Sequence, residues 1–309
     1  MPAVEEIPVI NTTDEPIIRF VEVWLPDDQR AQLQRTSVRV VGRNSDTLSE
    51  PMSVQSGEGI AGAAWKQAAA IILQEEPSSL LQQLSDDANE SLSAVIAIPV
   101  FRHQEILSVV VLGLSQAYGA AEVWARMDRD ELGISSSYYS GLPSFEFITR
   151  YTRFPKGAGV PGAVWKNGKA IVARNLDKAS CFIRSFGHDP AEIKSVIGLP
   201  VASLAGFPKS VLLLLEAAGA PFSRCTELHH CSLPPKSGDE QAELLIQKTD
   251  LLGAVCPENV APWRDQVVAR VNAAGAAVVF DSALDTVEFH LAWPIYCGGS
   301  LSSILSLTF

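Results

Sequence analysis

The chain has 309 residues, of which 47% are hydrophobic and 19% charged, and its formal net charge is −11. This is the composition of a globular protein with room for two or three domains. The acidic balance, without a cluster of Lys and Arg, argues against nucleic acid as a partner, because phosphates bind concentrated positive charge.

The lack of recognisable targeting signals in the sequence favours the cytoplasm. The sequence contains no run of about 18 uncharged apolar residues, which a membrane span needs. Its first residues, Met1–Glu6, are acidic where a signal peptide is basic and then apolar. Five cysteines without framework spacing suit a reducing compartment. We therefore expect a cytoplasmic protein that makes no membrane contact.

An internal repeat organises the sequence. The order Glu-Val-Trp, Gly-x-Gly-x-x-Gly, Ala-x-Trp runs from Glu22 to Trp65 and returns from Glu122 to Trp165, an offset of 100 residues. A fainter third copy starts near Pro221, where the pattern of residues 16–23 recurs with an offset of 205. We expect a flexible arm at 1–15 and three domains, at 16–115, 116–218 and 219–309.

The first repeat gives the order of elements. Alternating apolar residues predict strands at 20–25 and 36–41. A glycine turn then enters a short helix at 57–66, and a strand follows at 69–73. Leucines at helical spacing predict a helix at 78–92. The repeat closes with a hairpin of strands 94–100 and 106–114.

The second and third repeats follow this order with changes. The second has Phe145-Glu-Phe147 before its glycine turn, a shorter helix near 190–195, and a hairpin at 195–201 and 211–216. The third closes with a hairpin at 290–295 and 301–309 but lacks about ten residues between Gly275 and Pro294. We expect that it has lost its loop-and-helix layer. Because the connections between repeats are short, we expect the three domains to pack as a compact row.

Each closing hairpin carries a proline late in its first strand, at Pro99, Pro200 and Pro294. Proline has no N–H to donate to a strand ladder. The three positions therefore predict a strand edge, a strand end or a bulge.

The glycine motifs at Gly57 and Gly157 match the dinucleotide fingerprint, which needs a preceding parallel strand and a long crossover helix. Here the helix is stopped within about two turns and antiparallel hairpins follow, which disfavours NAD. In the structural interpretation, the glycines make a tight turn that brings the helix bearing Trp65 or Trp165 close to the sheet. A second interpretation, with exposed amides facing a small ligand, stays open.

Residues 154–172, then Asn175-Leu-Asp177, Phe182-Ile-Arg184 and Ile197–Val201 resemble the GAF domain. The first repeat matches in Gly59–Trp65 and Ile96–Val100, and the third keeps its first strand and final hairpin. The resemblance implies an α+β fold of three GAF-like domains, each an antiparallel sheet of about six strands flanked by helices. It also implies a small-molecule pocket under the segment before the closing hairpin, and a sensory or dimerising role beside a separate output enzyme.

Specific cofactors of the family are disfavoured. Bilin-binding members have a Cys-His pair, whereas Cys181 and His188 are seven residues apart. The cyclic-nucleotide motif is absent, and Cys181 alone does not supply the cysteines of free methionine sulfoxide reductases. The cofactor is thus left unknown.

The resemblance places the candidate ligand site in the second repeat. Arg184 is suited to hold a small anionic ligand by a bidentate contact. Alternatively, Phe182 and Trp165 belong to the core, and Asp177 and Arg184 are surface charges. The candidate ligand-binding residues are Phe154, Gly157, Gly159, Trp165, Asp177, Phe182 and Arg184.

The third repeat concentrates the side chains that zinc prefers: Cys225, His229, His230, Cys231, Cys256, His290 and Cys297. However, no Cys-x-x-Cys pair is present, and Cys225 and Cys231 on one strand face are about 20 Å apart. No metal site is therefore assigned. We also find no catalytic constellation.

We conclude that the chain is a non-enzymatic sensory or regulatory module that binds a small molecule or a signalling partner, with a homodimer as a further candidate. The alternative is an enzyme, or a redox or metal protein, that uses the glycine turns or the third repeat.

Overall fold

The computed structural model describes most of the three repeats. The expected arm at 1–15 and the expected helix at 78–92 lie outside the described residues, except Leu92, which is strand and not helix. The described residues are 16–42, 52–74, 92–117, 119–127, 129–174, 176, 193–204, 207–217, 220–232, 245–252, 261–282 and 287–309.

The first repeat forms a six-stranded sheet in the order β3-β2-β1-β6-β5-β4. Helix α1 (Gly59–Gln67) lies between β3 and β4 in the chain, as the glycine turn predicts. The strands are β1 (Ile18–Pro26), β2 (Gln32–Val40), β3 (Ser53–Gln55), β4 (Ile71–Leu73), β5 (Leu92–Arg102) and β6 (Glu105–Ser115).

The second repeat has the same sheet order, read as β9-β8-β7-β12-β11-β10. Its helices are α3 (Pro143–Tyr151), which contains Phe145-Glu-Phe147, and α4 (Gly159–Asn167). The short helix expected near 190–195 is wrong over its last three residues, which belong to β11. The strands are β7 (Gly119–Arg126), β8 (Glu131–Ser140), β9 (Phe154–Pro155), β10 (Ile171–Arg174), β11 (Ile193–Leu204) and β12 (Phe207–Ala217).

The third repeat forms a five-stranded sheet in the order β14-β13-β17-β16-β15. It keeps a helix, α5 (Ala261–Ala274), between β14 and β15, at the place that α1 and α4 take in the other repeats, and the expected loss of the loop-and-helix layer concerns the segment after it. The shortening lies after it, where seven residues (282–288) join β15 to β16 against eighteen (74–91) between β4 and β5. The strands are β13 (Cys225–Ser232), β14 (Leu245–Leu252), β15 (Val278–Asp281), β16 (Phe289–Cys297) and β17 (Ser300–Thr308).

All strand pairs within the described residues are antiparallel. The α+β fold class of flanked antiparallel sheets is confirmed. None of the described helices is long and apolar enough to span a membrane.

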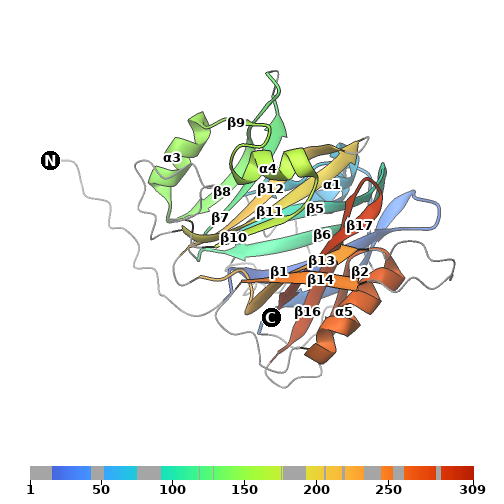
Figure 1. Cartoon of the computed structure of the whole chain (residues 1–309). Helices are drawn as coiled ribbons and strands as arrows, with labels where there is room; N and C mark the ends of the chain where they lie inside the picture. The colour runs from blue at the N-terminus through green and yellow to red at the C-terminus, as the bar shows by residue number, and fades with distance from the viewer. Residues whose placement is uncertain are drawn as a thin grey trace.

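One apolar core is shared by all three sheets. On β1, Val21 and Val23 face this core, whereas Phe20 and Trp24 face α1 in a separate cluster. The second and third sheets contribute Val123 and Leu291, among others, to the same shared core. Each sheet thus has an inner face toward the common core and an outer face toward its own helix. Figure 1 shows α3 and α4 on one side of the molecule and α5 on the opposite side, with the sheets between them.

The sheets close into a ring, so the expected row is wrong. The edge strand β4 reaches β8 of the second sheet, where the Gln74 side chain donates a hydrogen bond to the Ser137 carbonyl. β10 in turn contacts β14 of the third sheet. β15 returns to β2 of the first, where Asp281 accepts from Arg39 at 3.0 Å. The same edge of each sheet therefore meets the next sheet three times, as in a head-to-tail trimer.

The structure confirms the predicted strand edge at each of the three prolines. The short outer strands pair only as far as Ala97 on β5, Gly198 on β11 and Ala292 on β16. Two residues further along each strand stands the proline, where no outer neighbour among the described strands needs its missing N–H.

Candidate functional site

The two glycine motifs form the same turn. Gly57 and Gly157 have φ values of +93° and +89°, and each donates its N–H to the carbonyl five residues on, at 2.8 Å. A Cβ on Gly62 or Gly162 would lie 2.2 or 2.3 Å from the carbonyl oxygen of Gln55 or Pro155. The glycines therefore let the helix start pack directly on the preceding strand. The amide of Gly157 is used inside the turn.

The aromatic candidates of the second repeat lie on the outer face of its sheet. Phe154 is 1% exposed, and its ring meets Trp124 edge-on at 4.7 Å between centroids. Trp165, on α4, is 4% exposed and packs in the same cluster, with the Lys156 ammonium 5.7 Å above its ring. Gly159 is the first residue of α4, at φ +60°. Asp177, Phe182 and Arg184 lie outside the described residues.

A buried glutamate recurs on the first strand of every sheet, always on the outer face. Glu22, Glu122 and Glu227 are 4%, 0% and 0% exposed. Sequence reasoning used these residues only to align the repeats and assigned them no role. An acidic residue at the same position inside three apolar strands was the available signal.

Each glutamate has its own donors. Glu22 accepts from the Trp24 indole at 2.8 Å and from Arg35 at 2.9 Å. Burial raises the pKa of Glu22, and the hydrogen bond and charge of Arg35 oppose that shift. Glu122 accepts from the Trp124 indole and the Tyr139 hydroxyl, both at 2.9 Å.

In the third repeat, Glu227 accepts from the Arg264 guanidinium of α5, at 2.9 Å from Nε. Burial raises the pKa of Glu227 against the hydrogen bond and charge of Arg264. The glutamate therefore holds α5 on the outer face of its sheet.

Two histidines of the third repeat are buried on the same face. His229 Nε2 lies 3.9 Å from Glu227 Oε2, and His290 Nδ1 lies 3.1 Å from Thr308 Oγ1. Burial lowers the pKa of His229 to about 4, with the Arg264 charge as the next cause. Burial alone lowers the pKa of His290 to about 4. Both side chains are thus neutral at physiological pH.

The cysteines of the third repeat are in different states. Cys225 is disulfide-bonded, whereas Cys231 and Cys297 are free thiols. Burial raises the pKa of Cys231 to about 11, which keeps it from acting as a thiolate. In the part of the chain that the structure describes, no three His, Cys, Asp or Glu side chains come together as metal ligands. Cys256 lies outside the described residues.

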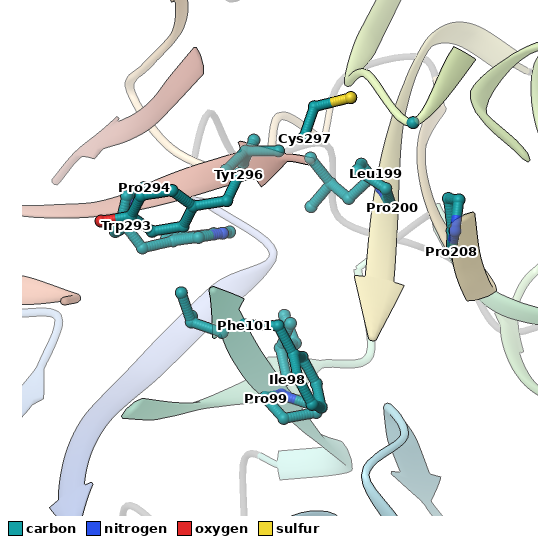
Figure 2. Close-up of a pocket in the computed structure, with 13 residues that line it drawn as sticks. Ile98, Pro99, Phe101, Leu199, Pro200, Pro208, Trp293, Pro294, Tyr296 and Cys297 are labelled. Atoms are coloured by element: carbon teal, nitrogen blue, oxygen red, sulfur yellow. The ribbon is translucent and has the colours of Figure 1, made fainter. Parts of the chain in front are cut away.

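A cavity lies where the three hairpins meet. Pro99, Pro200 and Pro294 line it together with the ring of Trp293 (Figure 2). Its volume is about 30 Å³. That is room for about two water molecules, and far below the several hundred Å³ of a metabolite pocket. The cavity is a packing junction of the ring and not a ligand site.

No protein-family model matches the chain, and no curated protein does. Among solved structures, the chain is similar to the GAF domain of A. aeolicus nlh2 in an inactive state, with 24% identity over 32% of this chain and 57% of that chain, at a TM-score of 0.26. It is also similar to the free methionine-R-sulfoxide reductase of Neisseria meningitidis in complex with its substrate, with 23% identity over 32% of this chain and 52% of that one, at a TM-score of 0.25.

A third similar structure is NreA of Staphylococcus aureus, mutated in its nitrate-binding site, with 20% identity over 35% of this chain and 80% of that one, at a TM-score of 0.27. The chain spans about half the length of the first two structures. These similarities cover about one third of the chain at low TM-scores, and they do not assign it a ligand.

Proposed function

We propose that the chain is a non-enzymatic sensory or regulatory module of three GAF-like domains at 16–115, 116–218 and 219–309. In this proposal the second domain binds a small molecule on the outer face of its sheet. The observation that carries it is the division of faces: the inner faces of all three sheets fill one shared core. A ligand is therefore left with the outer faces, where the recurring glutamates Glu22, Glu122 and Glu227 are buried.

The outer face of the second sheet combines an aromatic wall with polar groups. Phe154, Trp124 and Trp165 form the wall, and Glu122 and Tyr139 form a hydrogen-bonded pair within it. Aromatic walls with a few fixed polar groups are typical of small-molecule sites. In the first and third sheets the equivalent glutamate is bound by an arginine, Arg35 or Arg264.

We expect the ligand to be small and anionic. Its proposed polar anchors are Arg184 and the first-turn amides of α4, whose N-cap residue Ala158 makes no side-chain capping bond. A helix N-terminus and a guanidinium both favour an anion. In this proposal Arg184 is the residue that decides the preference for an anion.

The test begins with a thermal-shift screen of nitrate, phosphate and small carboxylates, followed by calorimetry on any anion that stabilises the protein. Arg184→Ala should weaken its binding by about 1.5–3 kcal/mol, the contribution of a hydrogen bond to a charged group. The control is Arg126→Ala, an exposed arginine of the same repeat that pairs with Asp130. Equal affinity of the Arg184 variant and the wild type would contradict the proposed anchor.

The alternative is a redox or metal protein, and the observation that favours it is that the third repeat has both a disulfide, at Cys225, and two free thiols, Cys231 and Cys297. Metal analysis and an absorbance spectrum of the purified protein test it directly. A stoichiometric metal or a chromophore would replace the sensory proposal with this one.

A further inference from the structure

Helix α3 has apolar residues on two opposite faces. Phe145 and Thr149 are 0% exposed and face the sheet. Phe147 and Tyr151, on the other side, are 63% and 73% exposed, and their rings meet at 5.4 Å between centroids. Within the described residues, the exposed large hydrophobic side chains are these two and Met127. An aromatic pair held in water on a helix is typical of a contact surface.

Two arginines lie beside this pair, and one of them, Arg150, is ion-paired with Glu146 of the same helix. Arg150 shares the face of Phe147 and Tyr151, because the three stand at helical spacing i, i+3 and i+4. Arg153 follows the helix, and its guanidinium donates to the carbonyls of Arg150 and Thr152, so these contacts do not offset its charge. Met127 and Arg153 both adjoin Gly133, which connects the methionine to the same surface.

The charge of the chain is divided between the repeats. Residues 116–218 carry 12 Lys and Arg against 9 Asp and Glu, a net charge of +3. Residues 1–115 carry 7 against 16, and residues 219–309 carry 5 against 10. The exposed aromatic pair therefore lies on the one basic repeat of an acidic protein. The partner that complements it is acidic.

We propose that this α3 surface, formed by Met127, Phe147, Arg150, Tyr151 and Arg153, binds an acidic segment of a partner protein that also carries apolar side chains. The apolar side chains cover the two rings, and the carboxylates pair with the arginines. Tyr and Arg are among the residues enriched at the positions that dominate the binding energy of interfaces. The inference extends the proposed function by giving the module a protein partner, and it needs no small ligand.

The probe is a fluorescein-labelled peptide of alternating Glu and Leu, twelve residues long, with a Lys-and-Leu peptide of the same length as its control. Fluorescence anisotropy measures both against the full chain. The proposal expects the acidic peptide to bind at least tenfold more tightly than the basic one. Equal binding of the two peptides, or no binding of either, would overturn it.

Two variants locate the binding. One double variant replaces the aromatic pair, Phe147→Ser with Tyr151→Ser, and the other reverses the charges, Arg150→Glu with Arg153→Glu. Each should weaken the binding of the acidic peptide at least tenfold. Lys66→Glu, an exposed residue in the last turn of α1, is the control for a reversed charge. Circular dichroism and the melting temperature check that the variants fold. Retained affinity in a folded double variant would overturn the proposal, as would an equal loss in the Lys66 variant.

Three further measurements assign the surface to another occupant and so also overturn the proposal. One is acidic-peptide binding that appears only when the chain starts at residue 16, which would assign the surface to the chain's own segment 1–15. Another is cosedimentation with phosphatidylserine vesicles that depends on Phe147 and Tyr151 in the absence of peptide binding. The last is self-association in the ultracentrifuge that the aromatic double variant abolishes.

Discussion

The buried His290 makes a measurable prediction about the pH dependence of stability. Its pKa is about 4 in the folded protein against 6.5 for an ordinary histidine. The unfolded chain therefore binds a proton at a higher pH than the folded chain does. Stability is complete above pH 6.5 and falls as the pH drops toward 4. Between about pH 7 and pH 5 this one histidine should cost about 2 kcal/mol of unfolding free energy.

The change that isolates this effect is His290→Val, because Val95 and Val196 stand at the equivalent place of the first and second repeats, four residues before each proline. Losing the contact with Thr308 lowers stability at both pH values and cancels in the difference. His229 is the less suitable target, since it lies beside Glu227 and Arg264 and the titrations are coupled.

The assay is urea unfolding at pH 7 and pH 5, followed by tryptophan fluorescence. The buried Glu22, Glu216 and Glu227 have raised pKa values, so they act in the opposite direction and stabilise the fold as the pH falls. These three glutamates are the same in the wild type and in the His290→Val variant, so their effect on stability cancels when the two proteins are compared. The variant should lose about 2 kcal/mol less than the wild type does between the two pH values. Equal losses would refute the assignment of a buried neutral His290.

Three further predictions follow from packing. Gly62→Ala should destabilise the first repeat by about 2–3 kcal/mol, because its Cβ would lie 2.2 Å from a backbone oxygen. The Cβ of Gly59→Ala meets no atom within 4 Å, so this variant should cost only about 1 kcal/mol. Urea unfolding compares the stabilities of the two variants. Arg35→Met should cost about 3–5 kcal/mol by leaving Glu22 buried with its charge, and Glu22→Gln in the same protein should recover part of that loss. Trp293→Ala should cost about 3–5 kcal/mol and lower the melting temperature of the whole ring; calorimetry that shows only the third repeat melting earlier would contradict a shared core.

The sequence predicted those parts of the fold that depend on local chemistry. The closing hairpins, the edge prolines and the glycine turns follow from which residues can donate a hydrogen bond or take a positive φ. The shortening of the third repeat was also located correctly, since the seven-residue link 282–288 lies within the predicted interval. Helix α5 was missed, because the third repeat lacks the glycine motif that precedes α1 and α4.

The ring could not be predicted because its contacts are not local. Val21 and Val23 have the pattern of the buried face of any strand. Nothing in this pattern shows that the side chains packed against them come from two other repeats. The disulfide at Cys225 was missed for a related reason, since spacing along the chain does not give distance in space. Of the candidate site, Phe154 and Trp165 lie together on one face, while the proposed role of Arg184 stays a prediction.

The buried glutamates indicate how three copies of one fold came to differ. The inner faces fill one core together and are mostly apolar, with buried polar side chains such as Ser108, Ser210 and Glu216 among them. Among the described residues, each outer face packs against the helix or helices of its own repeat. The same carboxylate is accordingly bound by Arg35 from the neighbouring strand, by Trp124 and Tyr139, or by Arg264 from α5. A change of donors at one position on the outer face of each sheet is what one expects if the ring is the scaffold and binding is done on its outside.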